Sequence, residues 1–232
     1  MKRDVRPSTH VIGNMKPTRI GLVTYAMYGG GMETFLLRLG KFLTQRGLEV
    51  ELVTTTEPGP WFARAADFGL AAANIPGWKQ GSRVRAVCRA WRVGNWLRRR
   101  KYDVIFLNHS PHAGAAVGLL PDDVVVVPVF HSDADAVYNV GCLSHRRWNI
   151  AVGVSPRVVE AVRGRVPDRP VNLIPYGVEM PAEEDWRNRS QTGRRNMRAI
   201  FVGRLDHRQK GVFFLPDILQ GCREQGIDLD LT

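Results

Sequence analysis

Cysteine is scarce in this sequence: the three among its 232 residues are far apart and form neither a C-x-x-C pair nor the spacing of a zinc site. This pattern excludes a disulfide framework and indicates free thiols in a reducing compartment. Long apolar runs are also lacking, because the two longest, residues 113–120 and 124–130, fall far short of the ~20 residues of a spanning helix. The polar start of the chain has no secretory signal. We therefore expect a cytoplasmic protein whose only membrane contact would be peripheral, at the inner face.

Acidic residues are the scarcer charge, since 22 Asp and Glu against 33 Lys and Arg give a formal net charge of +11. An excess of this size attracts phosphorylated small molecules, nucleic acid or an acidic membrane, without choosing among them. With 44% apolar and 24% charged residues, the composition is that of a globular protein with an ample core. No short repeat is present, which excludes a solenoid.

A strand-and-helix pattern runs through most of the sequence. Arg19 to Tyr25 reads as a buried strand, Met32 to Gly47 as a helix and Leu48 to Thr55 as a parallel second strand. Further strands are predicted over 102–107, 124–130, 150–154 and 171–174, and helices over 82–101, 113–120 and 157–165. Pro128 counts against one of these strands because it removes a ladder donor. Strands that are apolar nearly throughout predict an α/β fold, a doubly wound, Rossmann-like parallel sheet covered on both faces.

The pattern stops at a polar segment and then restarts. We expect residues 1–17 to be a disordered leader, 18–180 a Rossmann-like domain and 181–197 a linker. Beyond it come a strand over 199–202, a loop over 203–211, a helix over 212–225 and a strand onset over 227–231. One β-α-β unit is too small for a stable core of its own. Residues 198–232 are therefore expected to be the truncated start of a second domain.

Gly29, Gly30 and Gly31 lie between the first strand and its helix. Glycines let the backbone approach a ligand closely, and a helix N-terminus offers unpaired N–H groups to a phosphate. A plain tight turn accounts for the same residues, with the negative charge of Glu33 interacting favourably with the positive end of the helix dipole. The spacing matches neither G-x-G-x-x-G nor a P-loop, so neither a standard dinucleotide site nor an NTP site is indicated.

A second glycine-flanked loop carries Arg204 and Lys210 between Gly203 and Gly211. Arginine presents a fork for phosphate oxygens and lysine a mobile point charge, so the pair suits a diphosphate whose charge grows as it leaves. A solvated basic loop is the alternative. The position of the loop, directly after a buried strand, favours the phosphate site.

Taken in order, the motifs of this chain resemble those of the family 4 glycosyltransferases, which have the two-domain GT-B fold. They are a G-G-x-E loop at 30–33, a strand ending at 154–155, Tyr-Gly-Val-Glu at 176–179 where the family has N-G-V-D, and G-R-L…K-G at 203–211. They span nearly the whole chain. The family's later pair of glutamates has no counterpart before Thr232.

The resemblance implies a retaining transfer of a hexosyl or related sugar from a nucleotide-sugar donor, without a metal or other cofactor. It implies that Arg204 and Lys210 hold and stabilise the departing diphosphate, that backbone at Gly30 and Gly31 closes over it, and that His131 lies near the transferred sugar. We expect the acceptor to be lipid-linked or a cell-envelope glycan.

Three more residues follow strand ends and are candidates for the acceptor pocket: His109, His112 and Asp133. Asp133 is expected either to orient His131 or to cap the next helix. A metal site is not expected, because no carboxylate or cysteine accompanies the two histidines.

Ser82 to Lys101 is predicted to be a basic helix with Arg85, Arg89, Arg92 and Arg99 along one stripe. Such a stripe fits an acidic membrane surface, although a solvated helix that covers the sheet is the interpretation we favour. The net charge raises a nucleic-acid-binding module as a rival, but no recognition motif is present and we do not expect nucleic acid as a partner. A third alternative is a truncated, non-catalytic fragment of a GT-B enzyme, and we expect this chain alone to turn over little or no substrate.

Overall fold

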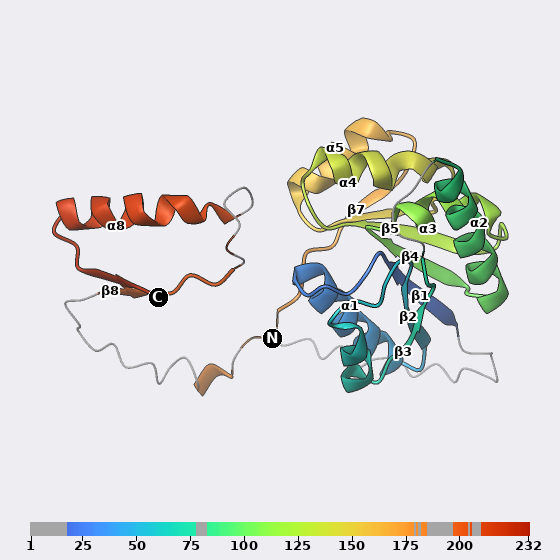
Figure 1. Cartoon of the computed structure of the whole chain (residues 1–232), viewed down its shortest axis with the longest axis horizontal. Coiled ribbons are helices and arrows are strands. Elements are labelled where there is room, and N and C mark those ends of the chain that lie inside the picture. The colour runs from blue at the N-terminus through green and yellow to red at the C-terminus, as the bar shows by residue number, and fades with distance from the viewer. Residues whose placement is uncertain are drawn as a thin grey trace, which may run out of the picture. The chain divides into compact units, whose positions relative to one another are not determined.

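The computed structural model describes residues 18–77, 83–178, 180, 182–184, 197–203, 205 and 210–232. The chain divides into two compact units, Met1–Gly177 and Val178–Thr232, which we take one at a time (Figure 1). The predicted leader and most of the predicted linker lie outside the described residues, so both stay predictions.

The first unit contains a seven-stranded parallel sheet with the strand order β3-β2-β1-β4-β5-β6-β7. Its strands are β1 Arg19–Thr24, β2 Glu49–Thr54, β3 Ala71–Asn74, β4 Val104–Asn108, β5 Val125–Phe130, β6 Ala151–Gly153 and β7 Val171–Leu173. The predicted doubly wound parallel sheet is confirmed. The order reverses between β1 and β4, and in such sheets ligands bind outside the carboxyl ends of the strands at the point of reversal.

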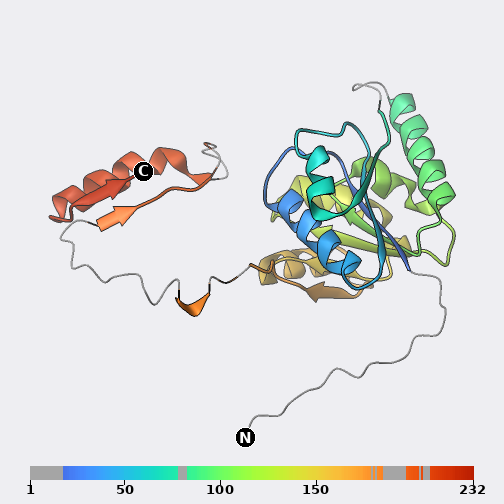
Figure 2. The same ribbon diagram turned by 90° about the horizontal axis from the view of Figure 1, so that it is seen from below.

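Helices cover both faces of this sheet. They are α1 Gly31–Thr44, α2 Arg83–Arg100, α3 Pro111–Ala116, α4 Asp135–Gly141 and α5 Pro156–Arg165, with short 3-10 helices η1 Phe62–Phe68, η2 Val117–Leu119 and η3 Cys142–Arg147. Leu22 of β1 packs in the core with α1 and η1, while its neighbour Val23 packs in the core with α2, α3 and α5. Figure 2 shows α1 and α2 on opposite sides of the sheet. Alternate residues thus enter different cores, which is why the strands are apolar throughout.

Two helices that follow strand ends, α3 and α5, have the same kind of N-terminal cap. Ser110 caps α3 by accepting a hydrogen bond from the Ala113 amide at 3.2 Å, and Ser155 caps α5 by accepting from the Val158 amide at 3.3 Å. Each serine is followed by a proline, whose missing N–H costs nothing in the first turn. The predicted Ser155 cap is confirmed.

Strand β5 forms despite Pro128, and its register explains why. The Val126 amide points towards the β6 side, where it donates to Asn149 Oδ1 at 2.9 Å. Amides alternate along a strand, so the nitrogen of Pro128 faces the same side. Pairing of β5 with β6 starts only at Val129. The missing donor therefore breaks no ladder hydrogen bond.

One strand and one α-helix of the first unit are absent from the sequence prediction, as are the 3-10 helices η1 and η3. Strand β3 is an edge strand of the sequence Ala-Ala-Ala-Asn, and alanine favours helices over strands. Helix α4 has only seven residues, too few to show a helical period. Both are held by their neighbours in the tertiary structure.

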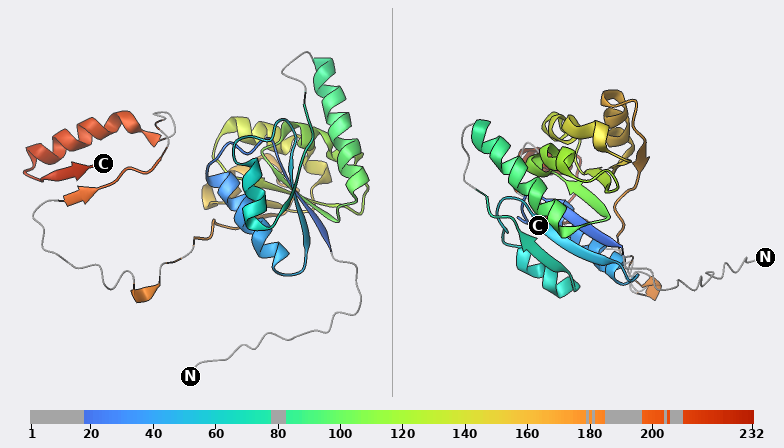
Figure 3. Two further views of the ribbon diagram at one scale, coloured as in Figure 1. Left: turned by 60° about the horizontal axis from the view of Figure 1, so that its bottom comes forward. Right: turned by 90° about the vertical axis from the view of Figure 1, so that its right-hand side faces the viewer.

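The described residues of the second unit form one β-α-β unit, made of β8 Met197–Ala199, η4 Val212–Phe214, α8 Leu215–Glu224 and β9 Leu229–Leu231 (Figure 3). Its two strands are parallel, with Met197 opposite Leu229. None of the residues described in this unit is buried, and Phe213 and Phe214 are 73% and 60% exposed. The unit therefore has no closed core of its own.

The glycine loop after β1 is braced by the segment after β2. The Met27 amide donates to Pro58 O at 3.0 Å, and the Trp61 amide donates to Met27 O at 2.8 Å. Gly59 has φ +78°, and a Cβ there would lie 2.6 Å from the Met27 carbonyl oxygen. Gly29, at φ +104°, packs against the Trp61 ring in the same way. Close backbone approach fixes the shape of this loop.

Gly59→Ala tests this brace, with Gly69→Ala as the matched control. Both glycines have left-handed φ angles, +78° and +70°, but nothing lies within 4 Å of a Cβ at Gly69. We expect the Gly69→Ala change to lower the free energy of unfolding by about 1–2 kcal/mol through backbone conformation alone. Gly59→Ala should cost a further ~1–3 kcal/mol, because Met27 must move. Urea unfolding of both variants measures the difference, and equal losses would disprove the close contact.

Candidate functional site

Polar residues replace apolar ones where the strands end at their carboxyl edge. Thr24 and Asn108 are register partners at the ends of β1 and β4, and both are fully buried. Thr55 Oγ1 donates to Thr24 O at 3.2 Å and lies 2.8 Å from Ser110 Oγ. These hydrogen bonds join the ends of β1, β2 and β4, so the loops that follow start from fixed positions.

His131, directly after β5, is held by hydrogen bonds at both ring nitrogens. Asn108 Nδ2 donates to the carbonyls of Val23 and Phe106 at 3.4 and 3.2 Å, which leaves Asn108 Oδ1 as the acceptor for His131 Nε2 at 2.8 Å. Nε2 therefore carries the proton, and Nδ1 accepts from the Tyr176 hydroxyl at 2.5 Å. The network fixes the ring and its tautomer.

Aromatic packing completes the surroundings of His131. Its ring stacks on Tyr176 at 5.8 Å and meets Phe35 of α1 edge-on at 5.2 Å. Burial, and to a lesser degree the nearby His109, lowers the pKa of His131 to about 4. The imidazole is therefore neutral at physiological pH and acts as a hydrogen-bonding group rather than a cation.

The glycine loop lies beside this histidine. Gly31 begins α1 and Gly30 caps it, and nothing lies within 4 Å of a Cβ at Gly31. Glu33 is only 7% exposed, and its Oε2 lies 3.1 Å from where a Cβ on Gly30 would be. Burial, followed by the charge of Glu33, raises the pKa of Tyr176 to about 12. The open backbone at Gly31, the Glu33 carboxylate and the Tyr176 phenol thus lie close to one another. This combination suits hydroxyl groups of a sugar.

His109 and His112 lie on different sides of the β4 end. His109 has an unusual positive φ of 45° and lines a pocket with Ser110 and apolar residues of β4, β5 and α4. His112 stacks on Tyr25 at 6.5 Å, after β1. Within the described ranges, no three His, Cys, Asp or Glu side chains are grouped to hold a metal ion.

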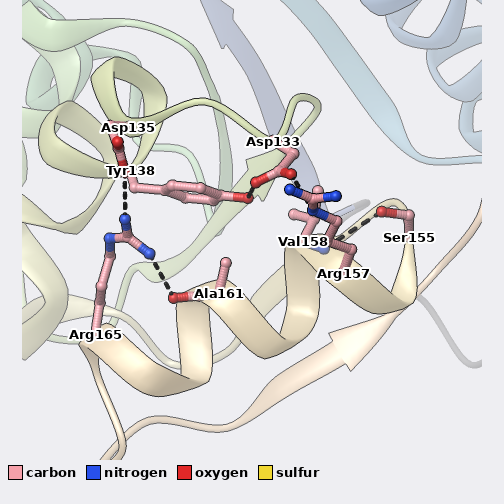
Figure 4. A network of polar contacts seen from close by, with 8 residues as sticks. All are labelled: Asp133, Asp135, Tyr138, Ser155, Arg157, Val158, Ala161 and Arg165. Atoms are coloured by element: carbon pink, nitrogen blue, oxygen red, sulfur yellow. Dashed lines mark hydrogen bonds and ion pairs between the residues drawn. The ribbon is translucent and has the colours of Figure 1, made fainter.

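Asp133 has different partners from either of those predicted for it. Tyr138 Oη donates to Asp133 Oδ1 at 2.9 Å, and Arg157 of α5 pairs with Oδ2 (Figure 4). The hydrogen bonds of His131 go to other residues, and α4 is capped at Ala134 without a side-chain bond. The prediction that Asp133 orients His131 or caps this helix is therefore wrong. The Asp133 carboxylate pairs instead with the positive charge of Arg157 on α5, so Asp133 connects the loop after β5 to that helix.

The predicted phosphate loop belongs to the second unit and is described only in part. Arg204 lies outside the described residues. A Cβ on Gly203 would lie 3.7 Å from Lys210 Cδ, so the lysine folds back along the start of the loop. Gly211 has φ +65° and begins η4. That Arg204, Lys210, Gly30 and Gly31 together hold one diphosphate stays a prediction.

Sequence reasoning missed the two partners of His131. Asn108 is a polar residue at the end of the apolar run of β4, and that position is a usable signal for a site residue. Tyr176 was visible only as a departure from the family's asparagine. Its contact with His131 spans 45 residues, a distance that no local pattern reports.

Comparisons with known proteins agree with this geometry. The model of Glycosyltransferase Family 4 matches residues 29–180. No curated protein matches the sequence. Among solved structures, HepE from Anabaena, in complex with UDP and glucose, has a TM-score of 0.66 and 15% identity over 92% of this chain and 60% of its own.

Two other solved structures are similar. MurG from Acinetobacter baumannii has a TM-score of 0.60 and 14% identity over 93% of this chain and 57% of its own. The lipopolysaccharide outer core galactosyltransferase WaaB, in its apo form, has a TM-score of 0.63 and 15% identity over 92% of this chain and 67% of its own. This chain thus spans about three fifths of the length of these glycosyltransferases, and the likenesses show a GT-B type of α/β fold. Because the family model covers most of its length, the chain belongs to glycosyltransferase family 4.

Proposed function

We propose that the protein transfers a sugar from a nucleotide-sugar donor to a hydroxyl acceptor, with retention and without a metal ion. The observation that carries the proposal is the group of Gly30, Glu33, His131 and Tyr176 at the strand ends beside the reversal of the sheet. HepE is described with UDP and glucose and WaaB as a galactosyltransferase, which supports a nucleotide donor that carries a hexose.

The hydrogen bonds around His131 have a direction that suits this task. His131 Nε2–H donates to Asn108, and the Tyr176 hydroxyl donates to His131 Nδ1. The lone pairs of the Tyr176 oxygen therefore stay available for a hydroxyl of the transferred sugar or of the acceptor. In this arrangement His131 positions Tyr176 through a neutral ring.

Catalysis would come chiefly from stabilisation of the leaving diphosphate. Arg204, Lys210 and the amides at Gly30 and Gly31 would stabilise its growing negative charge, as preorganised donors do in an oxyanion hole. Domain closure would exclude water and align the donor with the acceptor. We expect low turnover from this chain alone, because it spans about three fifths of the similar enzymes.

The outer face of α2 supports a peripheral membrane contact and a lipid-linked acceptor. Val87 and Trp91, four residues apart, are 69% and 63% exposed, and Arg92 lies beside them. Exposed apolar residues next to arginines suit the headgroup region of an acidic membrane. Among the helices that the structure describes, none is long and apolar enough to cross a bilayer.

Lys210→Ala tests the donor site. We expect UDP-glucose or another nucleotide sugar to raise the unfolding temperature of the wild type and to bind the variant at least about tenfold more weakly, because one charged hydrogen bond is lost. Arg204→Ala should behave alike. Arg223→Ala, an exposed arginine of α8, is the matched control and should keep the full shift. A sugar nucleotide that stabilises all four proteins equally would rule out the predicted phosphate loop.

The pH dependence of stability tests the state of His131. Its folded pKa of about 4 lies below the ordinary value of 6.5, so the unfolded chain binds the proton first as the pH falls. The wild type should lose stability as the pH falls from about 6.5 to 4, and His131→Gln should lose less of it over that range. Urea unfolding at several pH values compares the two, and NMR follows the His131 resonance directly. A His131 midpoint near 6.5 would contradict the buried, neutral ring.

Trp91→Ala tests the membrane contact. We expect the wild type to sediment with vesicles that contain phosphatidylglycerol, less so at high salt and weakly with phosphatidylcholine alone. The variant should bind about tenfold more weakly, because a large apolar side chain no longer enters the interface. Leu143→Ala, which removes an apolar side chain that is 68% exposed outside α2, is the control. Equal binding of the wild type and Trp91→Ala would remove this face from the proposal.

A further inference from the structure

Arg89 departs from the solvated stripe predicted for the basic helix. Its Nη2 donates to the Thr55 carbonyl, after β2, at 2.9 Å. A Cβ on Gly77, after β3, would lie only 1.6 Å from the same Nη2, so the absence of a side chain at Gly77 leaves the space that the guanidinium fills. Arg92, three residues further along α2, is exposed. Arg89 is thus built into the carboxyl edge of the sheet.

Other hydrogen-bonding groups lie at the same edge of the sheet. His112 comes from the first turn of α3, and Tyr25, on which it stacks, from the end of β1. Burial and then the charge of Arg89 lower the pKa of His112, which favours the neutral form of the ring. The Thr56 hydroxyl, next to the Thr55 carbonyl, is buried and has no hydrogen-bond partner among the residues that the structure describes. The Gly77 amide donates to Thr56 O at 3.1 Å.

These groups are separate from the residues proposed to hold the donor, which leaves the acceptor as the substrate that they would bind. In the order β3-β2-β1-β4-β5, Arg89 lies at the ends of β2 and β3 and His131 at the end of β5. Strands β2 and β5 are three spacings apart, about 14 Å. A molecule bound at both places would span the ends of β1 and β4, where the sheet order reverses.

The donors favour one chemical class. They come from three separate elements: α2, α3 and the loop after β2. A carboxylate accepts in its own plane, whereas a phosphoryl group has oxygens that point several ways and also accepts the arginine fork. We propose that Arg89, His112 and Thr56 form a subsite for the phosphoryl group of a phosphorylated acceptor. The inference rests on the proposed function, since it names the class of acceptor that the same edge of the sheet would bind.

The phosphoryl group has two sources with the same chemistry, a soluble sugar phosphate and a lipid-linked phosphate. Both present oxygens to Arg89. The source decides whether the remainder of the acceptor lies in water or in the membrane near α2, and binding assays with soluble and vesicle-bound phosphates separate the two.

The experiment is an NMR titration of the histidine resonances with inorganic phosphate, against chloride at equal ionic strength. In the wild type, phosphate should shift the His112 resonance saturably. Arg89→Gln should weaken this response about tenfold or more, because a charged hydrogen-bond donor is lost. Arg89→Lys, which keeps the charge without the fork, should fall between the two. Arg38→Gln, which changes an exposed arginine of α1, is the matched control and should respond like the wild type.

Thermal unfolding of each variant separates binding from folding. If Arg89 only ties α2 to Thr55, Arg89→Gln lowers the unfolding temperature but keeps the phosphate response, and this result would overturn the proposal. A wild type that gives no saturable shift would overturn it as well. The titration needs no donor. A failed phosphate titration with a nucleotide sugar still bound would therefore count against the phosphoryl subsite alone. Phosphate binding without binding of a nucleotide sugar would count against the donor site alone.

Two further arms identify the source. Glucose 1-phosphate and vesicles that contain phosphatidic acid are each tested for competition with inorganic phosphate at His112. Competition that Arg89→Gln abolishes supports the subsite in either arm, and the stronger arm names the source. Competition that is unchanged in Arg89→Gln places the phosphate elsewhere and overturns the assignment.

Discussion

The geometry of the site depends on the hydrogen bonds of the buried Asn108 side chain. Its amide donates to carbonyls of β1 and β4, and its oxygen accepts from His131 after β5. Three strands of a parallel sheet are thereby joined at one level through a side chain with no exposed surface. A buried amide without these partners would cost about 1–3 kcal/mol, so satisfied hydrogen bonds hold both the strand ends and the ring that the site needs.

Electrostatics divide the carboxyl edge of the sheet into two parts. Around His131 the groups are a neutral imidazole, a phenol and the buried carboxylate of Glu33, which suit hydroxyl groups. Near the ends of β2 and β3, Arg89 supplies a positive charge close to a neutral His112. The formal charge of +11 suggested an attraction for anions in general. Within the basic helix, Arg89 turns inward while Arg85 and Arg92 stay exposed, and the proposed phosphoryl subsite depends on this difference.

The family assignment and the site differ in how much they depend on sequence. The family model covers residues 29–180, whereas the similar structures share only 14–15% identity with the chain. At that identity the fold persists while individual contacts do not. Tyr176 illustrates this point, since it departs from the family's asparagine and yet completes the hydrogen bonds of His131. Residue roles therefore have to come from the contacts of this chain.

The sequence alone determined the first unit's parallel sheet, most of its helices and the Ser155 cap, because these depend on local periodicity and on the side chain next to the amide it satisfies. It also brought His109, His112 and His131 to the same edge, since parallel strands end together. Only the tertiary structure decided what these residues touch. Asp133 went to Arg157, Arg89 to the Thr55 carbonyl and Tyr176 to His131, all across at least 24 residues. Such pairings depend on which elements the fold brings side by side, and neither composition nor spacing contains that information.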